Sequence, residues 1–117
     1  MIPSQTEVLA RLAEVSRLLD KAKDDIAAFD EVAVRAKQSF EVEYARAYLG
    51  AEGSIEARKA WATIQTNDVA LHAELSAMRL RAARERSRVL GLQLDVGRTL
   101  SAAFRSQWAA EATGQPA

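Results

Sequence analysis

The sequence between Gln5 and Leu49 contains neither glycine nor proline, and its apolar residues recur at alternating intervals of four and three. These positions are Val8, Leu12, Val15, Leu19, Ala22, Ile26, Phe29, Ala33, Ala36 and Phe40. A heptad spacing of this kind is typical of helices that pack side by side along their length. Ser4 and Glu7 have the spacing of a capping box, so we predict one long helix that starts near Gln5.

The only strong break in this pattern lies at Gly50, Gly53 and Ser54. Gly50 can take the left-handed conformation that ends a helix, and Ser54 can cap the next one. A second heptad pattern then begins near Ile55. Its apolar members are Ile64, Leu71, Leu75, Met78, Ala82, Val89, Leu92, Val96 and Ala103, and its polar members are Asp68, Glu85 and Thr99.

These two patterns predict an all-α fold. We expect an antiparallel hairpin of two long helices with coiled-coil heptads, forming one domain over residues 1–112. The tip of the hairpin is expected at residues 50–54 and a disordered tail at residues 113–117. Gly91 and Gly97 interrupt the second helix, where we expect bending or fraying.

The second helix carries more apolar surface than one neighbouring helix can cover. An adjacent face holds Leu90, Leu94, Leu100, Phe104 and Trp108. Alanine accounts for 24 of the 117 residues and buries little area, so a two-helix rod has a thin interior. Exposed apolar stripes mark interfaces, and we therefore expect a homo-oligomer with these five residues at or near the contact between subunits. The pattern does not fix the number of subunits.

The residue types argue against catalysis. The chain has no cysteine, and its one histidine, His72, has no partner for a metal or nucleophile arrangement. We expect no enzyme activity, no metal, no cofactor and no small-molecule substrate. No apolar run reaches the roughly 18 residues of a membrane span, and the first residues show no signal-peptide pattern. We expect a cytoplasmic protein with no membrane partner.

The charges balance over the whole chain, with 16 basic and 16 acidic residues, so any affinity for nucleic acid must come from local patches. One such patch holds Arg79, Arg81, Arg84, Arg86 and Arg88. Arg81, Arg84 and Arg88 share a helical face and could follow a phosphate backbone. The alternative is that the hairpin places this cluster beside Asp20, Asp24 and Asp25, which would consume part of the charge in ion pairs.

A second basic group lies at the expected tip. Arg46 precedes the tip, Arg58 and Lys59 follow it, and the aromatic residues Tyr44, Tyr48 and Trp61 are interleaved with them. Basic side chains that hold phosphates beside rings on which bases stack are what single-strand binding requires. The alternative is that the rings close the end of the hairpin.

Several short runs resemble a group of small all-helical phage proteins. They read Glu43-Tyr44-Ala45-Arg46-Ala47-Tyr48-Leu49, Gly53-Ser54, Glu56-Ala57-Arg58-Lys59-Ala60 and, near the end, Gly97-Arg98-Thr99-Leu100-Ser101-Ala102-Ala103-Phe104-Arg105. These proteins are similar in layout to the UvsY-type recombination mediators, which load a recombinase onto single-stranded DNA. The resemblance covers residues 25–108. It implies a homo-oligomer in a bacterial host cell that binds single-stranded DNA and contacts a recombinase or a single-strand-binding protein.

We therefore predict a non-catalytic, phage-type accessory protein that binds single-stranded DNA and assists recombinase loading. The predicted nucleic-acid contacts are Arg46, Arg58, Lys59, Arg81, Arg84 and Arg88, on the local charge pattern alone. The alternative is a structural, assembly or adaptor protein that acts through coiled-coil interactions without DNA.

Overall fold

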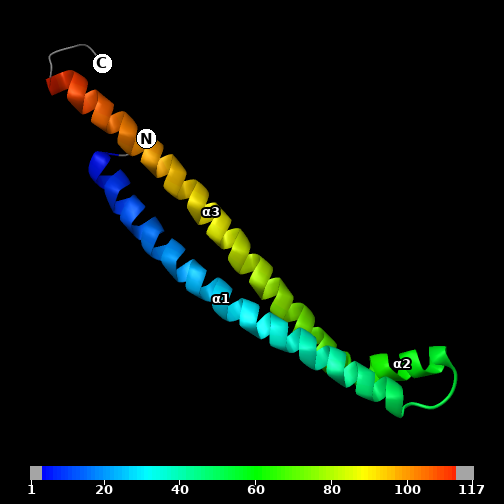
Figure 1. Cartoon of the computed structure of the whole chain (residues 1–117). Helices are drawn as coiled ribbons and strands as arrows, with labels where there is room; N and C mark the ends of the chain where they lie inside the picture. The colour runs from blue at the N-terminus through cyan, green and yellow to red at the C-terminus, as the bar shows by residue number, and fades with distance from the viewer. Residues whose placement is uncertain (1–3, 113–117) are drawn as a thin grey trace. The chain divides into compact units, whose positions relative to one another are not determined.

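The structure, a computed structural model, describes residues 4–112 and contains three α-helices (Figure 1). Helix α1 spans Gln5–Gly50, α2 spans Ile55–Gln65 and α3 spans Asn67–Ala112. The described residues contain no strand, which confirms the all-α class. The tail expected to be disordered, residues 113–117, lies outside the described residues.

Helix α1 begins with the capping box that the sequence predicts. The Glu7 amide donates to Ser4 Oγ at 3.2 Å, and the Ser4 amide donates to Glu7 Oε2 at 3.3 Å. These bonds satisfy two backbone groups that the first turn leaves without a helical partner. All ten positions of the first heptad pattern are buried or half-buried, so the sequence correctly identifies the packed face of α1.

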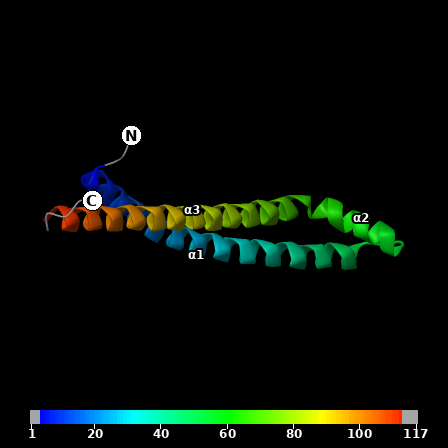
Figure 2. The same ribbon diagram turned by 90° about the horizontal axis from the view of Figure 1, so that it is seen from above.

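The loop between α1 and α2 forms at the predicted place (Figure 2). Ser54 caps α2, and its side chain accepts a hydrogen bond from the Ala57 amide at 3.2 Å. The expectation that Gly50 takes the left-handed conformation is wrong. In the described residues only Gly53 has a positive φ, 105°, because the chain completes helix α1 through Gly50 before it turns.

The expectation of one helix after the loop is also wrong, because α2 and α3 are separated at Thr66. Thr66 is buried, and its backbone angles of −107° and 14° are not helical. Its hydroxyl and its amide both donate to the Ala62 carbonyl, at 2.7 and 3.0 Å. A threonine hydroxyl bonded in this way often bends a helix, although Thr63 and Thr99 make the same bond inside continuous helices.

The chain divides into two compact units, to which both long helices contribute. The terminal unit comprises Met1–Asp24 and Glu85–Ala117, and the central unit comprises Asp25–Arg84. Each unit therefore contains a segment of α1 and a segment of α3, and the central unit also contains α2.

In the central unit, a row of mostly small residues faces the interior. The buried or half-buried members of this row on α2 and α3 are Ala62, Thr66, Val69, Ala73, Ser76, Leu80 and Ala83. Residues of α1 and α3, among them Phe40 and Leu80, line a common hollow of about 490 Å³. The two helical segments of this unit thus lie against each other.

In the terminal unit, the core is a small apolar cluster. Val15 and Ala22 of α1 are buried with Leu90 of α3, and Leu18, Leu19 and Leu94 pack against them. The inner face of α3 in this unit consists of Ser87, Leu90, Leu94, Gly97, Ser101 and Phe104, all buried or half-buried. A Cβ on Gly97 would overlap the Leu12 side chain, whose Cγ would lie 3.1 Å away, so Leu12 would have to move.

These positions correct two sequence predictions about α3. Leu90 is 6% exposed and packs with the half-buried Leu94 in the core of its own unit, so the face expected to meet another subunit is partly used within the chain. The apolar members of the second heptad pattern are instead all exposed. The inner row also has heptad spacing, but it mixes small residues with Leu90, Leu94 and Phe104, and at Gly97 the Leu12 side chain of α1 approaches closely. Helix α3 continues unbroken through Gly91 and Gly97.

Candidate nucleic-acid interface

The five arginines between Arg79 and Arg88 lie on α3 and are all exposed. Arg79, Arg81 and Arg84 belong to the central unit, and Arg86 and Arg88 belong to the terminal unit. A helix that carries cations at this density concentrates positive charge locally even in a chain with no net charge. How much of that charge is available depends on the ion pairs that these arginines make.

Two of the five arginines have acidic partners. Arg84 Nη2 lies 4.0 Å from Asp30 Oδ1 on α1, at the outer limit of an ion pair. Arg88 donates twice to Glu85 one turn earlier, from Nη2 at 2.6 Å and from Nε at 3.0 Å. These hydrogen bonds hold the pKa of Glu85 below its ordinary value and the pKa of Arg88 above its own.

The predicted ion pairs with Asp20, Asp24 and Asp25 do not form among the described residues. Arg84 was expected opposite Asp20 but lies beside Asp30. That expectation assumed that the chain reverses direction within the loop, so that residues at equal distances from the loop face each other. In the central unit, the loop and the first turn of α2 extend past the end of α1, which moves the facing residue farther along α1 (Figure 2).

The other three arginines, Arg79, Arg81 and Arg86, make no ion pair or side-chain hydrogen bond with any described residue. They supply the available charge on this part of α3. The sequence-based prediction includes Arg81 but omits Arg79 and Arg86, because it grouped only arginines that share one helical face.

The residues around the loop do not form one stacking surface. Tyr44 is half-buried and contacts Phe40 edge to face at 6.0 Å, while Tyr48 is also half-buried. Trp61 is 50% exposed and is the only one of the three aromatic residues with a large free surface. One ring is therefore available to a base at this end of the molecule.

The basic residues at the loop differ in their surroundings. Arg46 is exposed and lines a shallow hollow of about 340 Å³ on α1 together with Arg35 and Glu43. Lys59 lies 3.9 Å from Glu56 and is exposed. Arg58 is half-buried, and its Nε is enclosed without a hydrogen-bond partner among the described residues. Arg46 and Lys59 are therefore more accessible to a phosphate than Arg58 is.

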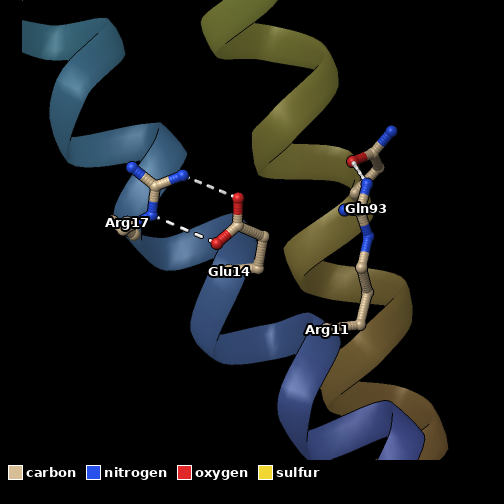
Figure 3. Close-up of polar contacts among 4 residues, drawn as sticks. All are labelled: Arg11, Glu14, Arg17 and Gln93. Atoms are coloured by element: carbon tan, nitrogen blue, oxygen red, sulfur yellow. Dashed lines mark hydrogen bonds and ion pairs between the residues drawn. The ribbon is translucent and has the colours of Figure 1, made fainter.

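An apolar groove lies between α1 and α3 in the terminal unit. Val8, Leu12 and Val15 line one side, and Val89, Leu92 and Val96 line the other, around a volume of about 570 Å³. Near it, Arg11 Nη2 donates to Gln93 Oε1 at 3.3 Å, and Arg17 pairs with Glu14 on α1 (Figure 3). We call Val89, Leu92 and Val96 the outer row. This surface could have been identified from the sequence, because its three residues belong to the second heptad pattern.

Residues 4–112 contain no group of three or more His, Cys, Asp or Glu residues arranged to hold a metal ion. His72, the one histidine, is exposed. No helix in the same range combines the length and hydropathy needed to cross a membrane. A search against protein-family models, curated proteins and solved structures finds no match for this chain.

Proposed function

We propose that this chain is a non-catalytic, homo-oligomeric accessory protein that binds single-stranded DNA through α3 and assists the loading of a recombinase. The observation that carries this proposal is the set of three exposed arginines, Arg79, Arg81 and Arg86, that have no acidic partner in the described structure. Free guanidinium groups at this density bind phosphates without regard to base sequence.

The remaining site residues have graded roles in this proposal. Arg84 and Arg88 add charge but share it with Asp30 and Glu85. Arg46 and Lys59 are proposed as a second set of phosphate contacts, and Trp61, which is 50% exposed, offers a ring on which a base can stack. The resemblance to UvsY-type mediators adds the expected partner, a recombinase or a single-strand-binding protein.

The proposal includes an antiparallel hairpin in which α1 packs on α3 as a coiled coil. The packing inside the terminal unit supports this arrangement. Leu12 lies at Gly97, whereas Ala22, ten residues later, shares a cluster with Leu90. Moving forward along α1 therefore corresponds to moving backward along α3 within that unit.

Fluorescence anisotropy with a labelled single strand of several tens of nucleotides, at about 50 mM salt, tests DNA binding. The test variant carries Arg79→Gln, Arg81→Gln and Arg86→Gln. We expect its affinity to fall at least about tenfold and the slope of log affinity against log salt to flatten by about 2, since each phosphate contact contributes about 0.7.

The matched control carries Arg17→Gln, Arg35→Gln and Arg98→Gln, which remove the same charge from residues that already have acidic partners. We expect it to bind within about threefold of the unmodified protein. An equal loss in both variants would mean that only total charge matters. If the unmodified protein shows no binding at this salt, the DNA proposal fails.

The second candidate function is an assembly or adaptor protein that does not use DNA. The groove and the outer row favour it, because they present an unoccupied apolar surface of the kind that binds a helix. A protein that self-associates in solution yet leaves the labelled strand unbound would support this candidate.

A further inference from the structure

The outer row is an exposed apolar surface with the spacing of a helix-packing seam. Val89, Leu92 and Val96 follow one another at intervals of three and four, and Leu92 is 51% exposed. Together with Val8, Leu12 and Val15 of α1 they line the groove of the terminal unit. A groove between two helices accepts a third helix when the side chains of that helix recur at the same intervals.

We propose that a second copy of this chain fills the groove, with the two α3 helices antiparallel and their outer rows in contact. A two-fold axis between Leu90 and Gly91 places Val89 of one copy opposite Leu92 of the other. Each outer row then lies against the groove of the other copy. Such an isologous contact closes on itself and gives a dimer.

Charge complementarity along the outer row supports this occupant. Arg88 precedes Val89 and Asp95 precedes Val96, so both lie on the same flank of the row, and both are exposed. An antiparallel pair brings this flank against the same flank of the second copy. Arg88 of each copy then lies within about 3 Å along the helix axis of Asp95 of the other, at a rise of about 1.5 Å per residue. The two-fold axis repeats the pair.

The same charges disfavour a parallel pair. In that arrangement Arg88 meets Gln93 of the second copy, and Asp95 meets Leu100, because each flank then faces the opposite flank. No ion pair is gained, and the Asp95 carboxylate is set against an apolar side chain. The charges therefore select the antiparallel orientation as well as the partner.

The hydrogen bonds of Arg88 are compatible with a second partner. Its Nε and Nη2 are bonded to Glu85, which leaves Nη1 for a carboxylate of another copy. Asp95 lies 4.0 Å from Arg98, so it is not tightly held within its own helix. The same axis places Glu85 opposite Val96 of the other copy, and the bonds from Arg88 to Glu85 offset its negative charge there.

Sedimentation equilibrium of the full chain at tens of micromolar tests this proposal without DNA. We expect twice the protomer mass of 12.8 kDa. Leu92→Glu should leave a monomer with unchanged helicity, because it places a charge in the centre of the contact. The matched control is Leu9→Glu, an exposed leucine of α1 that does not line the groove, and it should remain dimeric.

A charge exchange tests the orientation. Arg88→Asp alone sets two acidic pairs across the contact, and Asp95→Arg alone sets two basic pairs, so each should weaken dimerisation at least about tenfold. An equimolar mixture of these two variants should form a heterodimer of nearly unmodified affinity, since both of its pairs are then oppositely charged.

A monomeric or trimeric unmodified protein would overturn the proposal. So would a mixture that associates no better than its components, or a Leu9→Glu variant that dissociates as readily as Leu92→Glu. The proposal does not rest on DNA binding, because a dimer that ignores the labelled strand satisfies every expectation stated for it.

Discussion

Two hydroxyl side chains, those of Thr66 and Ser76, lie on the buried face of the central unit. Thr66 satisfies its hydroxyl locally by donating to the Ala62 carbonyl at 2.7 Å. Ser76 is 2% exposed, and its Oγ has no hydrogen-bond partner among the described residues. A buried hydroxyl left without a partner lowers stability by about 1–3 kcal/mol. The small side chain of Ser76 fits the packed face, but its hydroxyl lowers the stability of the fold.

We predict that Ser76→Ala stabilises the protein by about 1 kcal/mol more than Ser16→Ala does. Both substitutions gain the same helix propensity, because both serines lie inside long helices, but Ser16 is exposed. Only Ser76→Ala removes an enclosed hydroxyl. Urea unfolding followed by circular dichroism measures the difference. Equal gains for the two variants would mean that Ser76 has a partner such as an ordered water.

At the level of elements, the two glycines inside α3 have different reasons to be there. A Cβ on Gly91 would meet nothing within 4 Å, whereas one on Gly97 would overlap the Leu12 side chain. Gly91 therefore carries only the general cost of glycine in a helix, about 1 kcal/mol relative to alanine. Gly97 lets α1 and α3 approach each other within the terminal unit.

We predict opposite effects for alanine at these two positions. Gly91→Ala should stabilise the protein by about 0.5–1 kcal/mol through helix propensity. The free energy of unfolding of Gly97→Ala should be lower than that of Gly91→Ala by about 1–3 kcal/mol, because Leu12 must move out of a packed position. The unfolding midpoints of the two variants measure the difference. A gain for Gly97→Ala as large as that for Gly91→Ala would show that Leu12 moves aside freely.

The packed face of α1 was predictable from sequence, whereas that of α3 was not. Helix α1 has one clear apolar row, and the burial of Val8, Val15 and Ala22 follows from it. Helix α3 has two rows at heptad spacing, and the more apolar one faces outward. The inner row contains several alanine, serine and glycine residues among its leucines, and a ranking by hydrophobicity therefore chose the wrong face. The break at Thr66 was missed because no glycine or proline marks it.

The arginine segment was visible in the sequence, but the availability of its charge was not. Which arginines have partners depends on the register between α1 and α3 in the central unit. The pair of Arg84 with Asp30 lies ten residues along α1 from the expected position at Asp20. No local pattern contains that displacement, because α2 causes it.

For the whole molecule, stability depends on pH through carboxyl groups whose pKa differs between the folded and unfolded states. The hydrogen bonds from Arg17 and Arg88 hold the pKa values of Glu14 and Glu85 below 4.5, their ordinary value. A carboxyl group whose pKa is lower in the folded state stabilises that state at pH values above the pKa that the group has in the unfolded state. This contribution is lost as the pH falls through the folded pKa. The net charge also becomes strongly positive as the carboxylates are protonated.

We predict that the thermal unfolding midpoint falls as the pH is lowered from about 6 to about 3. Replacing both Glu14 and Glu85 by Gln should make this fall smaller, because the two ion pairs are then absent at every pH. The control carries Glu41→Gln and Glu43→Gln, two exposed residues without an ion pair in the described structure. The expectation fails if the control flattens the pH dependence as much as the Glu14 and Glu85 variant does.

The two rows of α3 lie two positions apart in the same seven-residue frame, and this offset restricts how the chain can change in length. Adding or removing seven residues within α3 keeps both rows aligned. Removing two residues would bring the downstream part of the outer row into the frame of the inner one, so that outer-row residues would face α1 and inner-row residues would face outward. Length variation in homologues should therefore concentrate in the loop at residues 51–54, while α3 changes only by whole heptads.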